Sequence, residues 1–135
     1  MKKTLIAVML IANLYLTACG AGGPTTEINV TLTDFQFTPN TFTVPAGAEI
    51  TLNVVNTGAV VHNFVIMNRD QTAGGAFKDD DEPNVYWQQV DIQPGGDTTT
   101  TFTAPTEAGE YEIVCRTEGH IASGMVGKLI VVAGE

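Results

Sequence analysis

The sequence predicts an all-β domain, an antiparallel β-sandwich of seven to eight short strands. Two observations favour this fold class. Apolar residues alternate with polar ones along most of the chain, which is the two-residue period of strands with one buried face. Groups rich in Gly, Pro, Asn and Asp interrupt these runs at regular intervals, as the turns of a sandwich do. A convincing amphipathic-helix period and an internal repeat are both missing from the sequence.

The first half of the domain alternates cleanly but changes phase once. The change falls across Thr33 and Asp34 and predicts a β-bulge there. Turn signals stand at Pro45 to Gly47 and at Asn56 to Gly58. Residues 60–67 are apolar on both phases, as expected of a central strand that is buried on two faces. The strands expected in this half are 28–37, with the bulge inside it, 42–44, 50–54 and 60–67.

The second half begins with a weakly structured insertion, Gly74 to Pro83. Its acidic run predicts a solvated loop, with partner docking as the alternative. Beyond it, the segment "QPGGD" joins two strands, and Tyr111, Ile113 and Cys115 share one phase. The acidic residues are Asp79, Asp80, Asp81 and Glu82, and the expected strands are 85–92, 98–102, 111–115 and 125–132.

The residues before position 28 are expected to lie outside the domain. A basic start precedes an apolar run of 12 residues, Leu5 to Leu16, which suits a secretory signal better than a membrane span of about 20 residues. The following "LTACG" resembles a bacterial lipobox, and the alternative is an ordinary signal peptide. We expect a lipoprotein signal peptide over 1–18, a lipidated Cys19 with a flexible tether to residue 27, and one domain over 28–135.

Charge and cellular location follow from this processing. The 135-residue chain has 15 acidic and 6 basic residues and a net charge of −9. Loss of Lys2 and Lys3 with the signal peptide leaves 117 residues and four basic ones, so the net charge becomes −11. Such a charge argues against nucleic acid and anionic membranes as partners. We expect an exported monomer, held to a membrane only by its N-terminal lipid and facing the periplasm or the cell exterior.

Three residues with metal-binding side chains stand five apart near the C-terminus: Cys115, His120 and Met125. Positions five apart lie on opposite faces of a strand and about 140° apart on a helix, so neither element brings the three together. A loop can do so, and Gly119 and Gly124 give it backbone freedom directly before His120 and Met125. The spacing predicts a loop wrapped around a common point.

The chemistry of these side chains favours copper. Structural zinc sites rarely use Met, and calcium and magnesium prefer oxygen ligands. A copper electron-transfer site needs two His and one Cys in a trigonal array with a weak axial Met. The second histidine, His62, shares the phase of the buried strand 60–67. The sequence thus predicts one copper ion that cycles between Cu(I) and Cu(II). The alternative is that His62 and Cys115 are ordinary core residues.

At these residues the sequence resembles the cupredoxins, the small blue copper proteins. The segments "FTPNTFTVPAGAEITLNVVNTGAVVHNFVIM" and "AGEYEIVCRTEGHIASGMVGKLIVV" are similar to the two halves of that family. The C-x4-H-x4-M spacing is similar to that of auracyanin and rusticyanin. The resemblance implies a Greek-key sandwich in which His62, Cys115 and His120 are equatorial ligands and Met125 is axial. It also implies that Asn63 ties the two ligand segments together by hydrogen bonds.

The function implied is a one-electron carrier between redox partners, such as a cytochrome or a membrane redox complex, and not an enzyme. A copper-binding chaperone or storage protein is the alternative. An enzyme with Cys115 as nucleophile would need an oxyanion-hole or orienting motif, and the sequence shows neither. We expect Ile121 and Ala122 to form an apolar docking rim beside His120, while the acidic run attracts a basic partner. Arg116, which follows the cysteine, has no role in this prediction.

Overall fold

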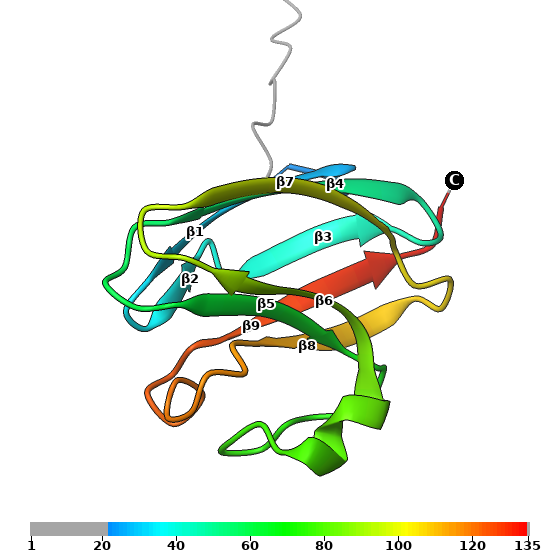
Figure 1. The fold of residues 1–135 in the computed structure, drawn as a ribbon. Helices are drawn as coiled ribbons and strands as arrows, with labels where there is room; N and C mark the ends of the chain where they lie inside the picture. The colour runs from blue at the N-terminus through cyan, green and yellow to red at the C-terminus, as the bar shows by residue number, and fades with distance from the viewer. Residues whose placement is uncertain (1–21, 135) are drawn as a thin grey trace, which may run out of the picture.

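The computed structural model describes residues 22–134, so the predicted signal peptide and Cys19 lie outside the described residues (Figure 1). Strands make up about half of the described chain, and a short 3-10 helix, η1, is its one helical element. The elements are β1 (Glu27–Thr33), β2 (Gln36–Thr38), β3 (Thr41–Pro45), β4 (Glu49–Asn56), β5 (His62–Met67), η1 (Asp79–Asn84), β6 (Val85–Ile92), β7 (Asp97–Thr103), β8 (Gly109–Val114) and β9 (Val126–Val132). Within residues 22–134, no helix has the length and apolar character needed to cross a bilayer.

The predicted β-sandwich is confirmed. One sheet has the order β2-β1-β4-β7 and the other the order β3-β9-β8-β5-β6, and the two sheets lie face to face (Figure 1). Both are mixed rather than antiparallel throughout, because β1 pairs in parallel with β4 and β3 in parallel with β9. The chain crosses to the second sheet for β3 before it returns for β4. Strands joined through such a crossover can run in the same direction, which a hairpin does not allow.

The core fills the space between the sheets. Alternate residues of β1 and β4 point inward and are buried, which confirms the period read from the sequence. Phe64 lies at the centre of this apolar cluster, where Phe37 and Phe42 pack against its ring at centroid distances of 5.6 and 6.0 Å. Burial of such large side chains is the main force that holds the two sheets together.

Strand β5 is buried along its whole length, as its two-phase apolar pattern predicts. It lies between β8 and β6 within its sheet. One face of β5 points into the main core. Val65 and Met67 point to the opposite face, where they pack in a second cluster with Val114 and Ile121. This outer layer is built from the β8–β9 loop and from the insertion that precedes β6, whose Phe77 packs against the cluster.

Two local predictions are wrong. The phase change at Thr33 and Asp34 is not a bulge but a tight turn at Asp34 and Phe35, since Thr33 of β1 pairs with Gln36 of β2. A reversal of the chain changes the phase just as a bulge does. The insertion predicted to be weakly structured contains η1. The N-cap residue Lys78 donates its backbone N–H to the Asp81 carboxylate of this helix at 2.8 Å.

Candidate metal centre

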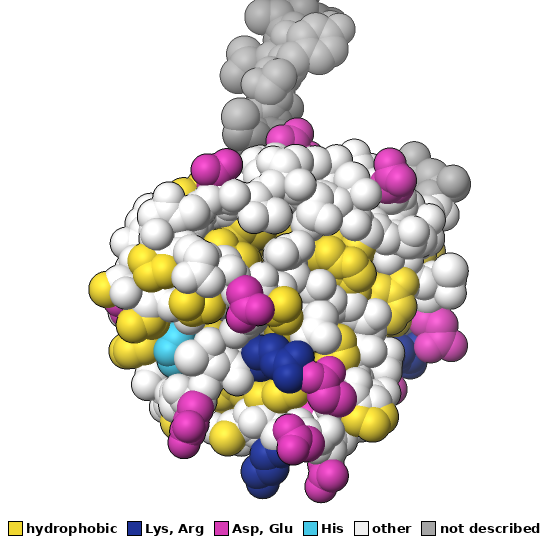
Figure 2. All heavy atoms as spheres, viewed as in Figure 1, with side chains coloured by type: hydrophobic (Ala, Val, Ile, Leu, Met, Phe, Trp, Pro, Cys, Tyr) yellow, Lys and Arg dark blue, Asp and Glu magenta, His cyan; other side chains and the backbone are white. Residues whose placement is uncertain are grey.

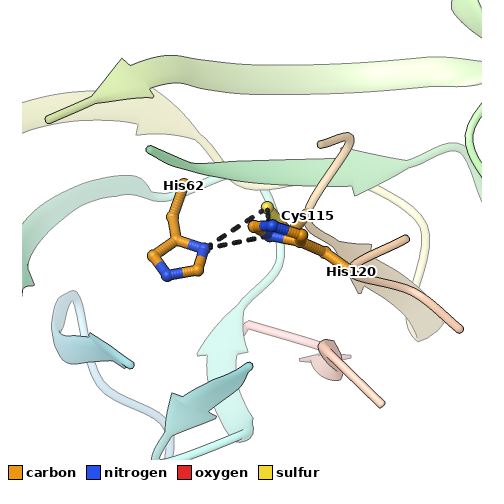
Figure 3. A group of neighbouring side chains, drawn as sticks. All are labelled: His62, Cys115 and His120. Carbon is orange, nitrogen blue, oxygen red and sulfur yellow. Dashed lines mark hydrogen bonds between the residues drawn. The ribbon is translucent and has the colours of Figure 1, made fainter. Parts of the chain in front are cut away.

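The candidate site lies at one end of the sandwich, where the β1–β2 turn, the β4–β5 connection and the β8–β9 loop come together (Figure 1). His62 is the first residue of β5, and Cys115 directly follows β8. His120 belongs to the loop that leads to β9. The three side chains converge on one point from these separate segments (Figure 3).

The donor atoms of these residues are close and shielded from water. His62 Nδ1 is 3.1 Å from His120 Nδ1, and Cys115 Sγ is 3.8 Å from the first nitrogen and 3.3 Å from the second. His62 and Cys115 are fully buried, and His120 is 6% exposed. The predicted grouping of His62, Cys115 and His120 is therefore present in the fold.

These separations leave room for one metal ion. A divalent ion such as Zn²⁺ lies about 2.0 Å from an imidazole nitrogen and about 2.3 Å from a thiolate sulfur. Two donors on one ion therefore stand no more than about 4.0 to 4.3 Å apart, and all three separations are shorter. Met125 is also fully buried beside Cys115 in the main core. One thiolate, two imidazoles and a thioether form the donor set that suits a single copper ion.

The β8–β9 loop is held in shape by its own backbone. The N–H of Met125 donates to the His120 carbonyl at 2.9 Å, and the Met125 carbonyl accepts from the N–H of Cys115 at 3.3 Å. These two bonds close the loop on itself. Gly119 and Gly124 have φ angles of 80° and 97°, a region that disfavours side chains. The predicted use of glycine at both turns is confirmed.

Asn63 links three segments around the thiol. Its backbone N–H donates to Cys115 Sγ at 3.3 Å. Its side-chain amide donates to Thr117 Oγ1 at 2.9 Å, and its side-chain oxygen accepts from the N–H of Asp91 at 2.9 Å. Asp91 has a φ of 57° and lies at a register shift between β5 and β6. The bulge in β6 thus aims a backbone donor at Asn63.

The outer nitrogen of His62 has a carboxylate partner that the sequence did not suggest. His62 Nε2 lies 2.8 Å from Asp34 Oδ1, and Asp34 Oδ2 accepts from the N–H of Ala59 at 2.8 Å. The Ala59 N–H and then His62 hold the pKa of Asp34 below its ordinary value. For His120, burial and then the neighbouring His62 lower the pKa, which favours the neutral ring that a metal requires.

The comparisons with known proteins agree with this geometry. The model of the cupredoxin-like domain family matches residues 5–131. The chain belongs to the cupredoxin family. It is 31% identical over 126 residues to chloroplastic plastocyanin of Chlamydomonas reinhardtii, and this match covers 93% of this chain and 79% of that protein.

Solved structures give the same result for the fold of this cupredoxin. The reduced auracyanin of Roseiflexus castenholzii aligns with a TM-score of 0.71 and 30% identity, over 82% of this chain and 99% of that one. Auracyanin A of Chloroflexus aurantiacus, a "blue" copper protein, aligns with a TM-score of 0.63 and 27% identity, over 82% of this chain and 100% of that one. The family resemblance read from the sequence is confirmed, and one copper ion is the cofactor that fits the site.

The prediction that Ile121 forms an apolar surface rim in this cupredoxin is wrong. Its side chain is only 8% exposed, because it packs with Val65 and Met67 over the outer face of β5. Ala122 is exposed, as expected. The larger apolar surface comes from Phe35, which is 37% exposed and whose ring centroid lies 4.8 Å from that of His120. Histidine atoms reach the surface beside a group of hydrophobic side chains (Figure 2).

Arg116 connects the metal loop of the cupredoxin to the acidic segment. Its guanidinium forms an ion pair with Glu82, donates to Gln88 Oε1 at 2.8 Å, and lies 4.7 Å from the centre of the Phe77 ring. No sequence motif marks these contacts. A lone basic residue directly after Cys115, in a chain with a large acidic excess, is the one available signal.

Proposed function

We propose that this cupredoxin is a one-electron carrier and not an enzyme. His62, Cys115 and His120 act as equatorial ligands of a single copper ion, and Met125 acts as a weak axial ligand. When bound, copper supplies the one-electron change between Cu(I) and Cu(II). The observation that carries the proposal is the buried group of two imidazole nitrogens and one thiol within 4.8 Å of one another.

The residues around this group suit a site that keeps its metal. The fold buries the donor atoms and ties them to one another through backbone hydrogen bonds, so the ligands need little movement when the charge of the site changes. Water is excluded by the core around Met125. A chaperone that releases copper is better served by exposed and exchangeable ligands. Burial therefore favours electron transfer over copper delivery or storage.

The test is to load the protein with Cu(II) and record its visible and EPR spectra through repeated reduction and oxidation. A carrier gives an intense thiolate-to-copper absorption that bleaches on reduction and returns in full on oxidation. A colourless copper complex refutes the blue-copper site. Loss of copper at each reduction would instead favour the chaperone.

The same proposal assigns electron exchange to the surface beside His120. Phe35 and Val60 are exposed there, and an apolar contact lets a partner approach the His120 ring closely. The acidic segment 79–82, held beside the site by Arg116, together with the net negative charge, attracts a basic partner such as a cytochrome or an exposed part of a membrane redox complex.

These two roles separate by their dependence on salt. Replacing Asp79, Asp80, Asp81 and Glu82 by amides should slow association at low salt and flatten the salt dependence, since exposed charges about 10 Å apart are screened near 0.1 M salt. Phe35→Lys should slow electron transfer at every salt concentration. Val55→Lys, at an exposed position on the outer face of β4, is the matched control. Equal rates for the two lysine variants at high salt would contradict the docking surface.

We also propose that the protein is exported and anchored by lipid on Cys19, with residues to position 27 as a tether. The basis is the lipobox-like "LTACG" sequence. Several acyl chains anchor stably where one chain binds only marginally. Cys19→Ala should release the domain from the membrane fraction or block its processing, with an unchanged copper spectrum. Recovery of the wild-type protein in soluble, unlipidated form after signal cleavage would refute the anchor.

A further inference from the structure

The β1–β2 turn contacts both of the imidazole rings at the metal site. Asp34 places a carboxylate oxygen 2.8 Å from Nε2 of His62, and the next residue, Phe35, packs its ring against His120 at 4.8 Å between centroids. The turn lies 28 residues before His62 in the chain. It belongs to neither of the two segments that supply the ligands.

We propose that Asp34 is a positioning residue that fixes the tautomer of His62 and lowers the reduction potential of the site. This inference rests on the proposed copper function. A neutral imidazole has one N–H and one free lone pair, and an ionised carboxylate can only accept a hydrogen bond. With Asp34 at Nε2, the proton is held on Nε2. The lone pair of Nδ1 then faces Cys115 and His120, which is the direction of the metal.

The surrounding structure keeps the Asp34 carboxylate in this place. Its second oxygen accepts from the N–H of Ala59 at 2.8 Å. The connection that carries Ala59 is itself anchored by Asn56, whose side chain accepts from the N–H of Gly58 and donates to the Val60 carbonyl, both at 2.9 Å. The carboxylate is therefore braced from two sides and cannot rotate away without breaking a second hydrogen bond.

Gly58 provides the space for this contact. A Cβ atom at position 58 would overlap the Asp34 carboxylate and lie 2.9 Å from His62 Nε2. Its φ is not in the left-handed region, so backbone conformation does not require glycine here. Glycine is needed here because of Asp34: any larger side chain at position 58 would displace the Asp34 carboxylate from the His62 ring.

The effect on the metal follows from charge. A carboxylate that accepts the outer N–H makes the imidazole a stronger donor, and partners of this kind change metal affinity by about 10- to 100-fold. His62 is fully buried and the Asp34 side chain is 28% exposed, so water screens the interaction only in part. The negative charge favours Cu(II) over Cu(I). Each tenfold difference between the two affinities corresponds to about 59 mV.

The experiment compares Asp34→Ala and Asp34→Asn with Asp91→Asn. Asp91 is exposed and touches the site only through its backbone N–H, so its amide removes one charge near the copper without removing a contact to a ligand ring. Three quantities are measured: the Cu(II) affinity by competition, the reduction potential, and the imidazole tautomers of the metal-free protein by 15N NMR.

We expect Asp34→Ala to lower the Cu(II) affinity by about 10- to 100-fold and to raise the potential. In the metal-free protein it should lose the strict Nε2–H tautomer of His62. Asp34→Asn keeps an acceptor oxygen, so it should keep the tautomer while the potential rises by less. Asp91→Asn should leave the tautomer unchanged and move the potential least.

The proposal is overturned if Asp34→Asn and Asp91→Asn raise the potential equally, because Asp34 would then act only as a nearby charge. It is also overturned if Asp34→Ala keeps the tautomer and binds Cu(II) within twofold of the wild type. Should Asp34→Ala not fold, Gly58→Ala replaces it and is expected to give the same loss of tautomer. A blue wild type with unaffected Asp34 variants removes this inference alone, whereas a colourless wild type removes the proposed function.

Discussion

Replacing Asn63 by alanine should destabilise the metal-free protein by about 2 to 4 kcal/mol. The side chain is 4% exposed and makes two short hydrogen bonds, one to Thr117 in the metal loop and one from the backbone of Asp91 in the β6 bulge. The two bonds together contribute about 1 to 3 kcal/mol, and the part-buried Asp91 N–H, left without an acceptor, costs about 1 kcal/mol more, at the low end of the range for a buried group. The Thr117 hydroxyl keeps a second partner, the Val61 carbonyl, so the Asp91 N–H accounts for most of the penalty.

Urea unfolding of the metal-free protein is the measurement, because bound copper would add its own stabilisation to the native state. For a slope of about 2 kcal/mol per molar urea, the midpoint should fall by about 1 to 2 M. Asn53→Ala is the matched control, since Asn53 bonds Glu27 and Asn29 at exposed positions. We expect the control to change stability by no more than about 0.5 kcal/mol. Equal losses in the two variants would refute the linking role of Asn63.

Three further predictions concern the ligands and the core. Cys115→Ser should abolish the charge-transfer colour of the Cu(II) protein even where some metal remains, which a visible spectrum checks. Met125→Leu should keep copper and raise the reduction potential measured by voltammetry, because a donor that helps to stabilise Cu(II) is lost; an empty site or an unchanged potential would contradict the axial role. Burial, and then the charge of Glu107, holds the pKa of Tyr111 above its ordinary value of about 10. The folded protein therefore keeps a proton that the unfolded chain releases, so stability should fall as the pH rises above 10, and Tyr111→Phe should reduce that slope in urea titrations between pH 9 and 11.

The sequence predicts the features of this protein that depend on local pattern. Alternation of buried and exposed residues along β1 and β4 has a period of two, so the sandwich can be read directly. The grouping of His62, Cys115 and His120 can also be predicted, because few metals other than copper suit a thiol, two imidazoles and a thioether, and copper needs both histidines of the chain. The parallel pairing of β1 with β4 has no such signal, since neighbours in a sheet need not be neighbours in the chain.

What the sequence does not reveal are contacts between turns that lie far apart along the chain. Asp34 reads as an ordinary turn residue, and its contact with His62 exists only because two connections meet at one end of the sandwich. Arg116 finds Glu82 for a similar reason, through the folding of an insertion back over the sheet. The family resemblance implies that Ile121 frames the outer edge of the His120 ring at the surface, but the second apolar layer over β5, which buries Ile121, is not visible as a pattern in the sequence.

That second layer limits how the metal loop can be engineered. Exchanging the β8–β9 loop between cupredoxins is an attractive way to alter a copper site, and a shorter loop would still supply cysteine, histidine and methionine. In this protein the same loop covers Val65 and Met67 with Ile121. A graft without a matching apolar residue would expose the apolar side chains of Val65 and Met67 on β5 to solvent and promote self-association. Loop transplants into this scaffold must therefore carry the equivalent of Ile121 together with the ligands.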